Sequence, residues 1–143
     1  MELIIERIPT GIEGLDRLIE GGIPKFTSGI IITDRRSPGA LFGKQILWND
    51  LNRGLNCAYF HTRYASGKEF FDEMAGHGWD AEPYAERGSL RVADYLQLAE
   101  LTPEDARSKR FVGDARKIEG QTISAAKLTE LTRTANYDFA LYD

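Results

Sequence analysis

Cysteine, histidine and long apolar runs are scarce in this chain of 143 residues, and each scarcity excludes a class of protein. The single cysteine, Cys57, excludes an internal disulfide, and its apolar surroundings favour a buried hydrophobic role over a nucleophilic one. His61 and His77 are too few and too far apart to indicate a metal site. No apolar run approaches the length of a membrane span, and the N-terminus lacks the features of a signal peptide. We therefore expect a cytoplasmic protein with no metal and no membrane contact.

Composition favours one globular domain over residues 1–143. Hydrophobic residues make up 42% of the chain and charged residues 28%, which suits a chain of this length that buries a core. The formal net charge of −4 does not favour binding to nucleic acid or to an anionic membrane. We find no internal repeat or low-complexity tract.

Apolar segments alternate with amphipathic ones along the chain, which predicts a layered α/β domain. The runs 30–32 and 139–142 are apolar without alternation, as in parallel strands that are buried on both faces. A parallel sheet with helices on both faces is therefore expected. We expect strands near residues 2–7, 26–33, 57–62, 89–95 and 137–143, and helices near 11–20, 40–53, 66–77 and 123–136.

Several short motifs resemble those of one family. The segment 11–16 has the pattern glycine, apolar residue, two further residues, leucine and aspartate, and 21–24 reads Gly-Gly-Ile-Pro. The run Gly78-Trp79-Asp80 and an apolar strand ending at Asp143 follow. Together these motifs resemble the RecA superfamily, in particular its KaiC-like and RadA-like ATPase domains, over the whole chain.

The resemblance implies a P-loop NTPase fold of the RecA/KaiC type, with Asp143 in the place of the Walker B aspartate. It also implies that the strand between the P-loop strand and the Walker B strand follows Asp143. We therefore expect a truncated version of the family fold. Either the chain is a fragment of a longer product, or it covers its sheet edges by association with a partner chain.

The phosphate-binding loop of the family corresponds here to residues that lack its chemistry. Such a loop needs glycines to turn backbone N–H groups inward, a lysine for the outer phosphates and a hydroxyl for magnesium. In the gap-free register the two glycines fall on Thr33 and Pro38, the lysine on Gly39 and the hydroxyl on Ala40. Shifting the register by one residue places the lysine on Ala40 and the hydroxyl on Leu41, which again supplies neither group. The degenerate loop positions are Thr33, Asp34, Arg35, Arg36, Ser37, Pro38, Gly39 and Ala40.

The acidic pair that activates water in KaiC-like ATPases corresponds to Arg63 and Tyr64, so this function is also expected to be lost. Arg35, Arg36 and Lys44 remain as possible anion contacts near the start of the helix. Lys44 lies more than one helical turn past the loop, roughly 6 Å along the axis. It is therefore a poor substitute for the missing lysine.

These features predict a catalytically inactive KaiC/RecA-like domain without a cofactor, acting as an oligomerising or regulatory module. Its expected partner is a second copy or another KaiC/RecA-like protein. One alternative is an ATPase that binds ATP and magnesium in a composite site between subunits. Another is a recombinase-like accessory protein that binds nucleic acid through the basic segment 101–121, but the acidic residues within that segment make this less favoured.

Overall fold

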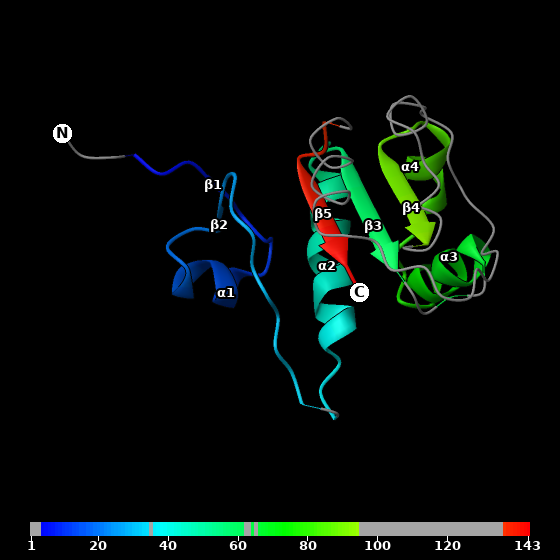
Figure 1. The fold of residues 1–143 in the computed structure, drawn as a ribbon, viewed down its shortest axis with the longest axis horizontal. Coiled ribbons are helices and arrows are strands. Elements are labelled where there is room, and N and C mark those ends of the chain that lie inside the picture. The colour runs from blue at the N-terminus through cyan, green and yellow to red at the C-terminus, as the bar shows by residue number, and fades with distance from the viewer. Residues whose placement is uncertain (1–3, 35, 62–63, 65, 95–135) are drawn as a thin grey trace, which may run out of the picture.

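The computed structural model describes residues 4–34, 36–61, 64, 66–94 and 136–143, arranged as two small sheets and four helices (Figure 1). The expected helix 123–136 lies largely outside these residues, and the basic segment 101–121, Arg35 and Arg63 lie wholly outside them. The elements are β1 (Arg7–Ile8), α1 (Glu13–Leu18), β2 (Ile23–Pro24), α2 (Gly39–Asn52), β3 (Cys57–His61), α3 (Gly67–Gly76), α4 (Glu82–Glu86), β4 (Leu90–Asp94) and β5 (Phe139–Tyr142).

The larger sheet is parallel, as the sequence predicted, with the strand order β4-β3-β5. Cys57 of β3 lies opposite Leu90 on one side and Phe139 on the other. All five residues of β3 are buried, which explains why its sequence does not alternate between apolar and polar residues. The expected strands 57–62, 89–95 and 137–143 are confirmed, with slightly shorter bounds.

One face of this sheet carries the core described by the structure. Alternate residues of a strand point to the same face, so Cys57 and Tyr59 share a face with Leu90 and Val92. Residues from two helices, and one residue just before a third, pack on this face. They are Leu47 and Leu51 of α2, Phe70 and Met74 of α3, and Ala81 before α4. The helices expected at 40–53 and 66–77 are confirmed as α2 and α3, whereas α4 was not expected.

The N-terminal unit, made of β1, α1 and β2, is tied to the C-terminal half of α2. Asn49 donates from Nδ2 to the carbonyl oxygen of Thr10 at 3.0 Å, and Arg53 donates to that of Pro9. Gly11 adopts a φ of +75°, and a Cβ there would lie 2.6 Å from Nδ2 of Asn49. A glycine is therefore required at this contact for both backbone and steric reasons.

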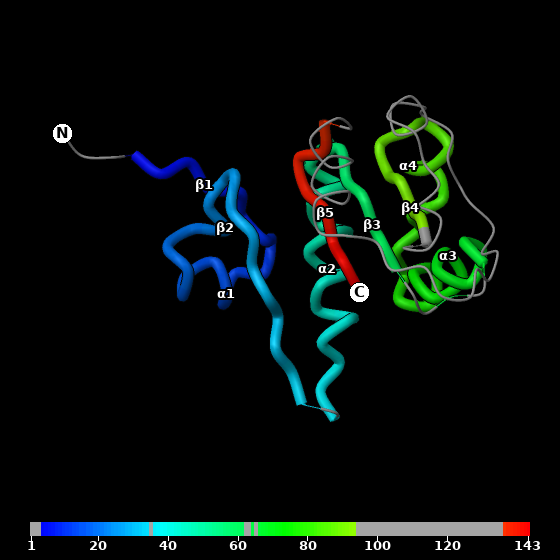
Figure 2. Tube along the Cα trace, viewed as in Figure 1, coloured from blue at the N-terminus to red at the C-terminus, as the bar shows by residue number. Residues whose placement is uncertain are grey.

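Two of the expected strands are wrong. Within residues 4–7 the strand expected at 2–7 begins only at Arg7, and β1 pairs antiparallel with β2 instead of joining the parallel sheet. Residues 27–34 form no strand and run outside the sheet toward the start of α2 (Figure 2). Ile30 and Ile32 are 87% and 88% exposed. An apolar run favours burial, but it does not supply a neighbouring strand, and residues 27–34 pair with none of β3, β4 and β5.

Candidate functional site

The candidate site lies where β3 and β5 end and α2 begins, at the lower end of the sheet in Figure 1. Ligands of parallel α/β folds bind outside the carboxyl ends of the strands. Five polar or charged residues converge here from α2, β3, α3 and the segments after β3 and β5. We call them the carboxyl-end cluster: Lys44, Tyr59, Tyr64, Glu73 and Asp143.

Lys44 is the buried centre of this cluster. Its side chain is 1% exposed, and Nζ lies 2.7 Å from Oε1 of Glu73, whose side chain is 35% exposed. The ammonium also donates to the hydroxyl of Tyr64. Gly43 helps to place this part of α2 close to β5, because a Cβ at Gly43 would lie 2.9 Å from Cδ1 of Leu141.

Tyr59 links the cluster to the end of β5. Its hydroxyl donates to Oδ2 of Asp143 at 2.7 Å, and the backbone N–H of Asp143 donates to the carbonyl of Phe60 at 2.9 Å. Burial of Tyr59 raises the pKa of its hydroxyl well above the usual value, and the hydrogen bond to Asp143 acts in the same direction. Tyr59 therefore stays protonated and acts as the donor to Asp143, the residue predicted to take the place of the Walker B aspartate.

The loop that precedes α2 uses its own carboxylate as an acceptor. Oδ1 of Asp34 accepts from the backbone N–H of Arg36 at 2.9 Å and from Oγ of Ser37 at 2.7 Å. The hydrogen bond from the Ser37 hydroxyl, followed by those from backbone N–H groups, lowers the pKa of Asp34. Pro38 precedes the helix without a side-chain cap.

The start of α2 also lies close against the segment that leads into it. A Cβ at Gly39 would lie 2.5 Å from Oγ1 and Cγ2 of Thr33. Ala40 is the second residue of the helix and is half-buried. Gly39 and Ala40, which the sequence comparison predicts to stand in place of the lysine and the hydroxyl, are thus helical residues with no polar side chain.

The structure therefore groups some of the predicted site residues and separates others. Lys44 meets Tyr64 directly, and Asp143 joins them through Tyr59. Asp34 and Ser37 bond within the loop. The hydrogen bonds of Lys44 go to Tyr64 and Glu73, so within the described residues they do not join it to the loop. Its ammonium, expected as an anion contact, is bonded to a carboxylate and a phenol.

Sequence reasoning did not single out Tyr59 or Glu73. Tyr59 lies in an apolar strand and was taken as part of that strand. Glu73 lies 29 residues after Lys44, and its neighbours on α3 include the exposed acid Asp72, so no local pattern distinguished it. A buried lysine requires a counter-ion, but its partner could be identified only once the fold was known.

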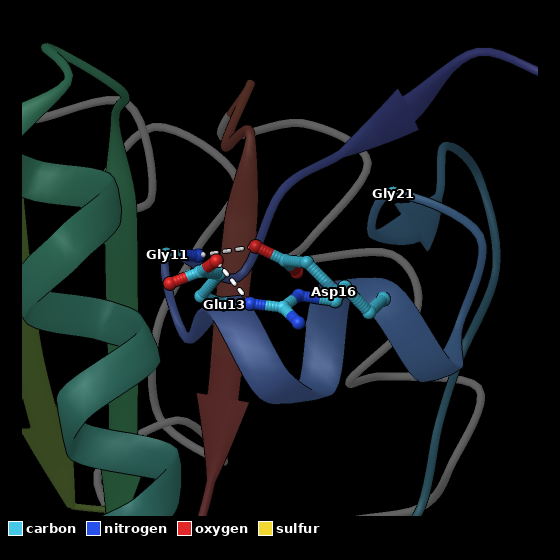
Figure 3. Close-up of a pocket in the computed structure, with 5 residues that line it drawn as sticks. Gly11, Glu13, Asp16 and Gly21 are labelled. Atoms are coloured by element: carbon cyan, nitrogen blue, oxygen red, sulfur yellow. Dashed lines mark hydrogen bonds and ion pairs between the residues drawn. The ribbon is translucent and has the colours of Figure 1, made fainter.

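A second hollow lies on the N-terminal unit, lined by Gly11, Glu13, Asp16, Arg17 and Gly21 (Figure 3). Burial acts to raise the pKa of Asp16, but hydrogen bonds from Thr10 and Gly11 outweigh it and lower the pKa. Glu13 and Arg17 form an ion pair one helical turn apart. These polar groups therefore stabilise the turn into α1.

Among the residues that the structure describes, no group of three histidine, cysteine, aspartate or glutamate side chains is arranged to hold a metal ion. Within the same part of the chain, no helix combines the length and the apolar character needed to cross a bilayer. The cytoplasmic location remains a prediction.

Replacement of Tyr59 by phenylalanine tests the link to β5. We expect Tyr59→Phe to lower the free energy of unfolding by about 1–2 kcal/mol, because a part-buried carboxylate loses its donor. Tyr84→Phe is the matched control, since it removes an exposed hydrogen bond of 2.9 Å to Asn52 and should cost less than about 0.5 kcal/mol. Urea denaturation measures both values. Equal losses would contradict a specific role of the Tyr59 hydroxyl.

Comparison with known proteins identifies the family. The family model described as "ATPase: KaiC" matches residues 8–134. A UPF0273 protein of Pyrococcus horikoshii is 32% identical over 88 residues, which cover 62% of this chain and 35% of that protein. A UPF0273 protein of Thermotoga maritima is 24% identical over 132 residues, covering 91% of this chain and 54% of the relative. The circadian clock protein KaiC3 of a Synechocystis species is 33% identical over 90 residues, covering 63% and 18%.

The fold gives the same result. The crystal structure of a KaiC-like protein from Pyrococcus horikoshii superimposes with a TM-score of 0.59 and 27% identity, over 67% of this chain and 46% of that one. The chain spans about a third to a half of the length of the two UPF0273 relatives. The resemblance inferred from the entry motifs and the terminal aspartate is thus confirmed. The chain belongs to the KaiC family of ATPase domains.

Proposed function

We propose that this KaiC-family domain does not hydrolyse ATP and acts as an oligomerising or regulatory module. The observation that carries the proposal is the burial and ion pairing of Lys44, the lysine nearest the loop. Lys44 is buried and bonded to Glu73, while Gly39 and Ala40 provide no side chain for phosphate or magnesium. The residues present therefore do not fit a magnesium–nucleotide complex of the usual P-loop type.

The chemistry of phosphoryl transfer supports this reading. The reaction depends on positioning and on stabilising negative charge that spreads over the transferred group. A loop without the lysine and the hydroxyl supplies little of either. The carboxylate of Asp34 also accepts from the backbone N–H of Arg36 and the hydroxyl of Ser37, so these donors of the loop are already occupied. An ATPase with a composite site would need its cation from another chain.

We expect isothermal titration calorimetry with Mg-ATP to give no dissociation constant tighter than about 1 mM, where binding is worth roughly 4 kcal/mol. The control is the combined variant Thr33→Gly, Pro38→Gly, Gly39→Lys and Ala40→Thr, which restores the family residues and should regain some binding. Hydrolysis by this variant should remain absent while Arg63 and Tyr64 are unchanged. Saturable micromolar binding by the unaltered chain would refute the proposal and favour the composite-site ATPase.

Assembly is the second part of the proposal, and exposed apolar side chains support it. Phe26, Ile30 and Ile32 are 103%, 87% and 88% exposed within a short stretch of sequence. Apolar groups gathered in this way are typical of a surface that contacts another protein. A partner strand along an outer strand of the sheet is the other interface that we consider, because sheet edges readily accept a further strand.

We expect light scattering to show a homodimer or larger ring at tens of micromolar chain concentration. Ile32→Lys should weaken that assembly, because a charge in an apolar interface lacks a partner. The control is Glu13→Lys, which changes an exposed residue of α1 and should leave the mass unchanged. A stable monomer, with unfolding that does not depend on concentration, would contradict the assembly proposal.

A further inference from the structure

Lys44 joins elements that are otherwise distant in the sequence. It extends from α2 to Glu73 of α3, 29 residues later, and to Tyr64, which lies between β3 and α3. Tyr64 in turn donates to Oε2 of Glu73, the other oxygen of the same carboxylate. The three side chains thus form a closed ring of hydrogen bonds.

The surroundings of the ammonium are suited to a cation. Burial of a charged group is costly unless it is paired and hydrogen-bonded. Here Nζ has the carboxylate of Glu73 at 2.7 Å, and it lies 5.2 Å from the centroid of the Tyr64 ring and 5.9 Å from that of Tyr59. Aromatic faces attract cations at such separations. The site therefore provides one full negative charge, from the Glu73 carboxylate, and two partial negative charges, from the faces of the Tyr59 and Tyr64 rings.

Tyr59 connects the surroundings of Lys44 to both α3 and the end of β5. Its ring stacks on Phe70 of α3 with centroids 4.6 Å apart, and its hydroxyl holds Asp143 after β5. A change at Lys44 therefore acts on α3 in two ways, through Glu73 and through the Tyr59 ring. It also reaches the end of β5.

We propose that Lys44 is an internal cation that closes the carboxyl end of the sheet, by holding α3 and Tyr64 against the end of β3, which Tyr59 links to the end of β5. Closure of this edge then requires no bound ligand. A molecule that binds between α3 and the end of β3 must break the contact between Lys44 and Glu73. This inference uses the same contact as the proposed function, but it concerns the packing of α3, which can be measured without nucleotide.

Hydrogen exchange measured by mass spectrometry on Lys44→Met tests this closure without nucleotide. Methionine keeps a side chain of similar length but removes the charge. We expect amides of α3 and β5 to exchange at least about tenfold faster, while amides of β1 and α1 change less than about twofold. We also expect the melting temperature to fall by about 5–10 °C, because Glu73 loses its buried counter-ion.

Lys68→Met is the matched control. Lys68 lies on α3 and pairs with Asp72 at 2.6 Å, but both side chains are exposed. Loss of this pair should change the melting temperature by less than about 2 °C and leave the exchange of β5 unaltered. An equal effect of the two lysine replacements would overturn the proposal.

Glu73→Gln provides a second route if Lys44→Met does not fold. It removes the negative charge from a side chain that is one-third exposed, and it should give the same local pattern of faster exchange at smaller size. In the double variant Lys44→Met, Glu73→Gln, the loss in melting temperature should be smaller than the sum of the single losses. Exchange that accelerates evenly along the chain, or additive losses, would show that Lys44 supports the core without closing this edge.

Discussion

The ion pair between Lys44 and Glu73 is the contact on which the carboxyl end of the sheet depends. Lys44 comes from α2, Glu73 from α3 and Tyr64 from the segment between β3 and α3, and the Lys44 side chain is almost completely buried. The pair is stable because Tyr64 bonds to both partners and because aromatic rings enclose the ammonium. Without the carboxylate, the burial of this lysine would be unfavourable. The same ion pair therefore determines both how α3 packs on the sheet and which charges are available at the site.

The start of α2 differs from the carboxyl end of the sheet in how its polar groups are satisfied. The strands β3, β4 and β5 and the helix α2 keep the parallel α/β arrangement and align with a KaiC-like structure. The loop before α2 instead satisfies its donors with Asp34. The charge of Lys44 is paired in the interior with Glu73. A phosphate-binding loop instead needs a lysine that reaches the phosphates.

The sequence was sufficient to predict those elements whose signal is local. Strand β3 and helix α2 follow from apolar runs and helical spacing, and their bounds agree with the structure within one residue. The segment 26–33 was misjudged because apolar character indicates burial but does not supply a neighbouring strand. The partner of Lys44 could not be predicted, since 29 residues separate it from Glu73 and only the packing of α3 brings them together. A contact between residues that are distant in the sequence can be predicted only when the fold is known. The residue type at each motif position, in contrast, can be read directly from the sequence.

We infer that the chain's own side chains fill the carboxyl end of the sheet, and NMR of the lysine ammonium groups tests this most directly. With ¹⁵N-labelled lysine, the Nζ signal of Lys44 should be protected from exchange with water, because the ammonium is buried and hydrogen-bonded. Glu73→Gln should abolish that protection, and millimolar Mg-ATP should leave the signal unchanged. A Lys44 signal that exchanges like an exposed lysine, or that shifts in a saturable way with Mg-ATP, would contradict the account.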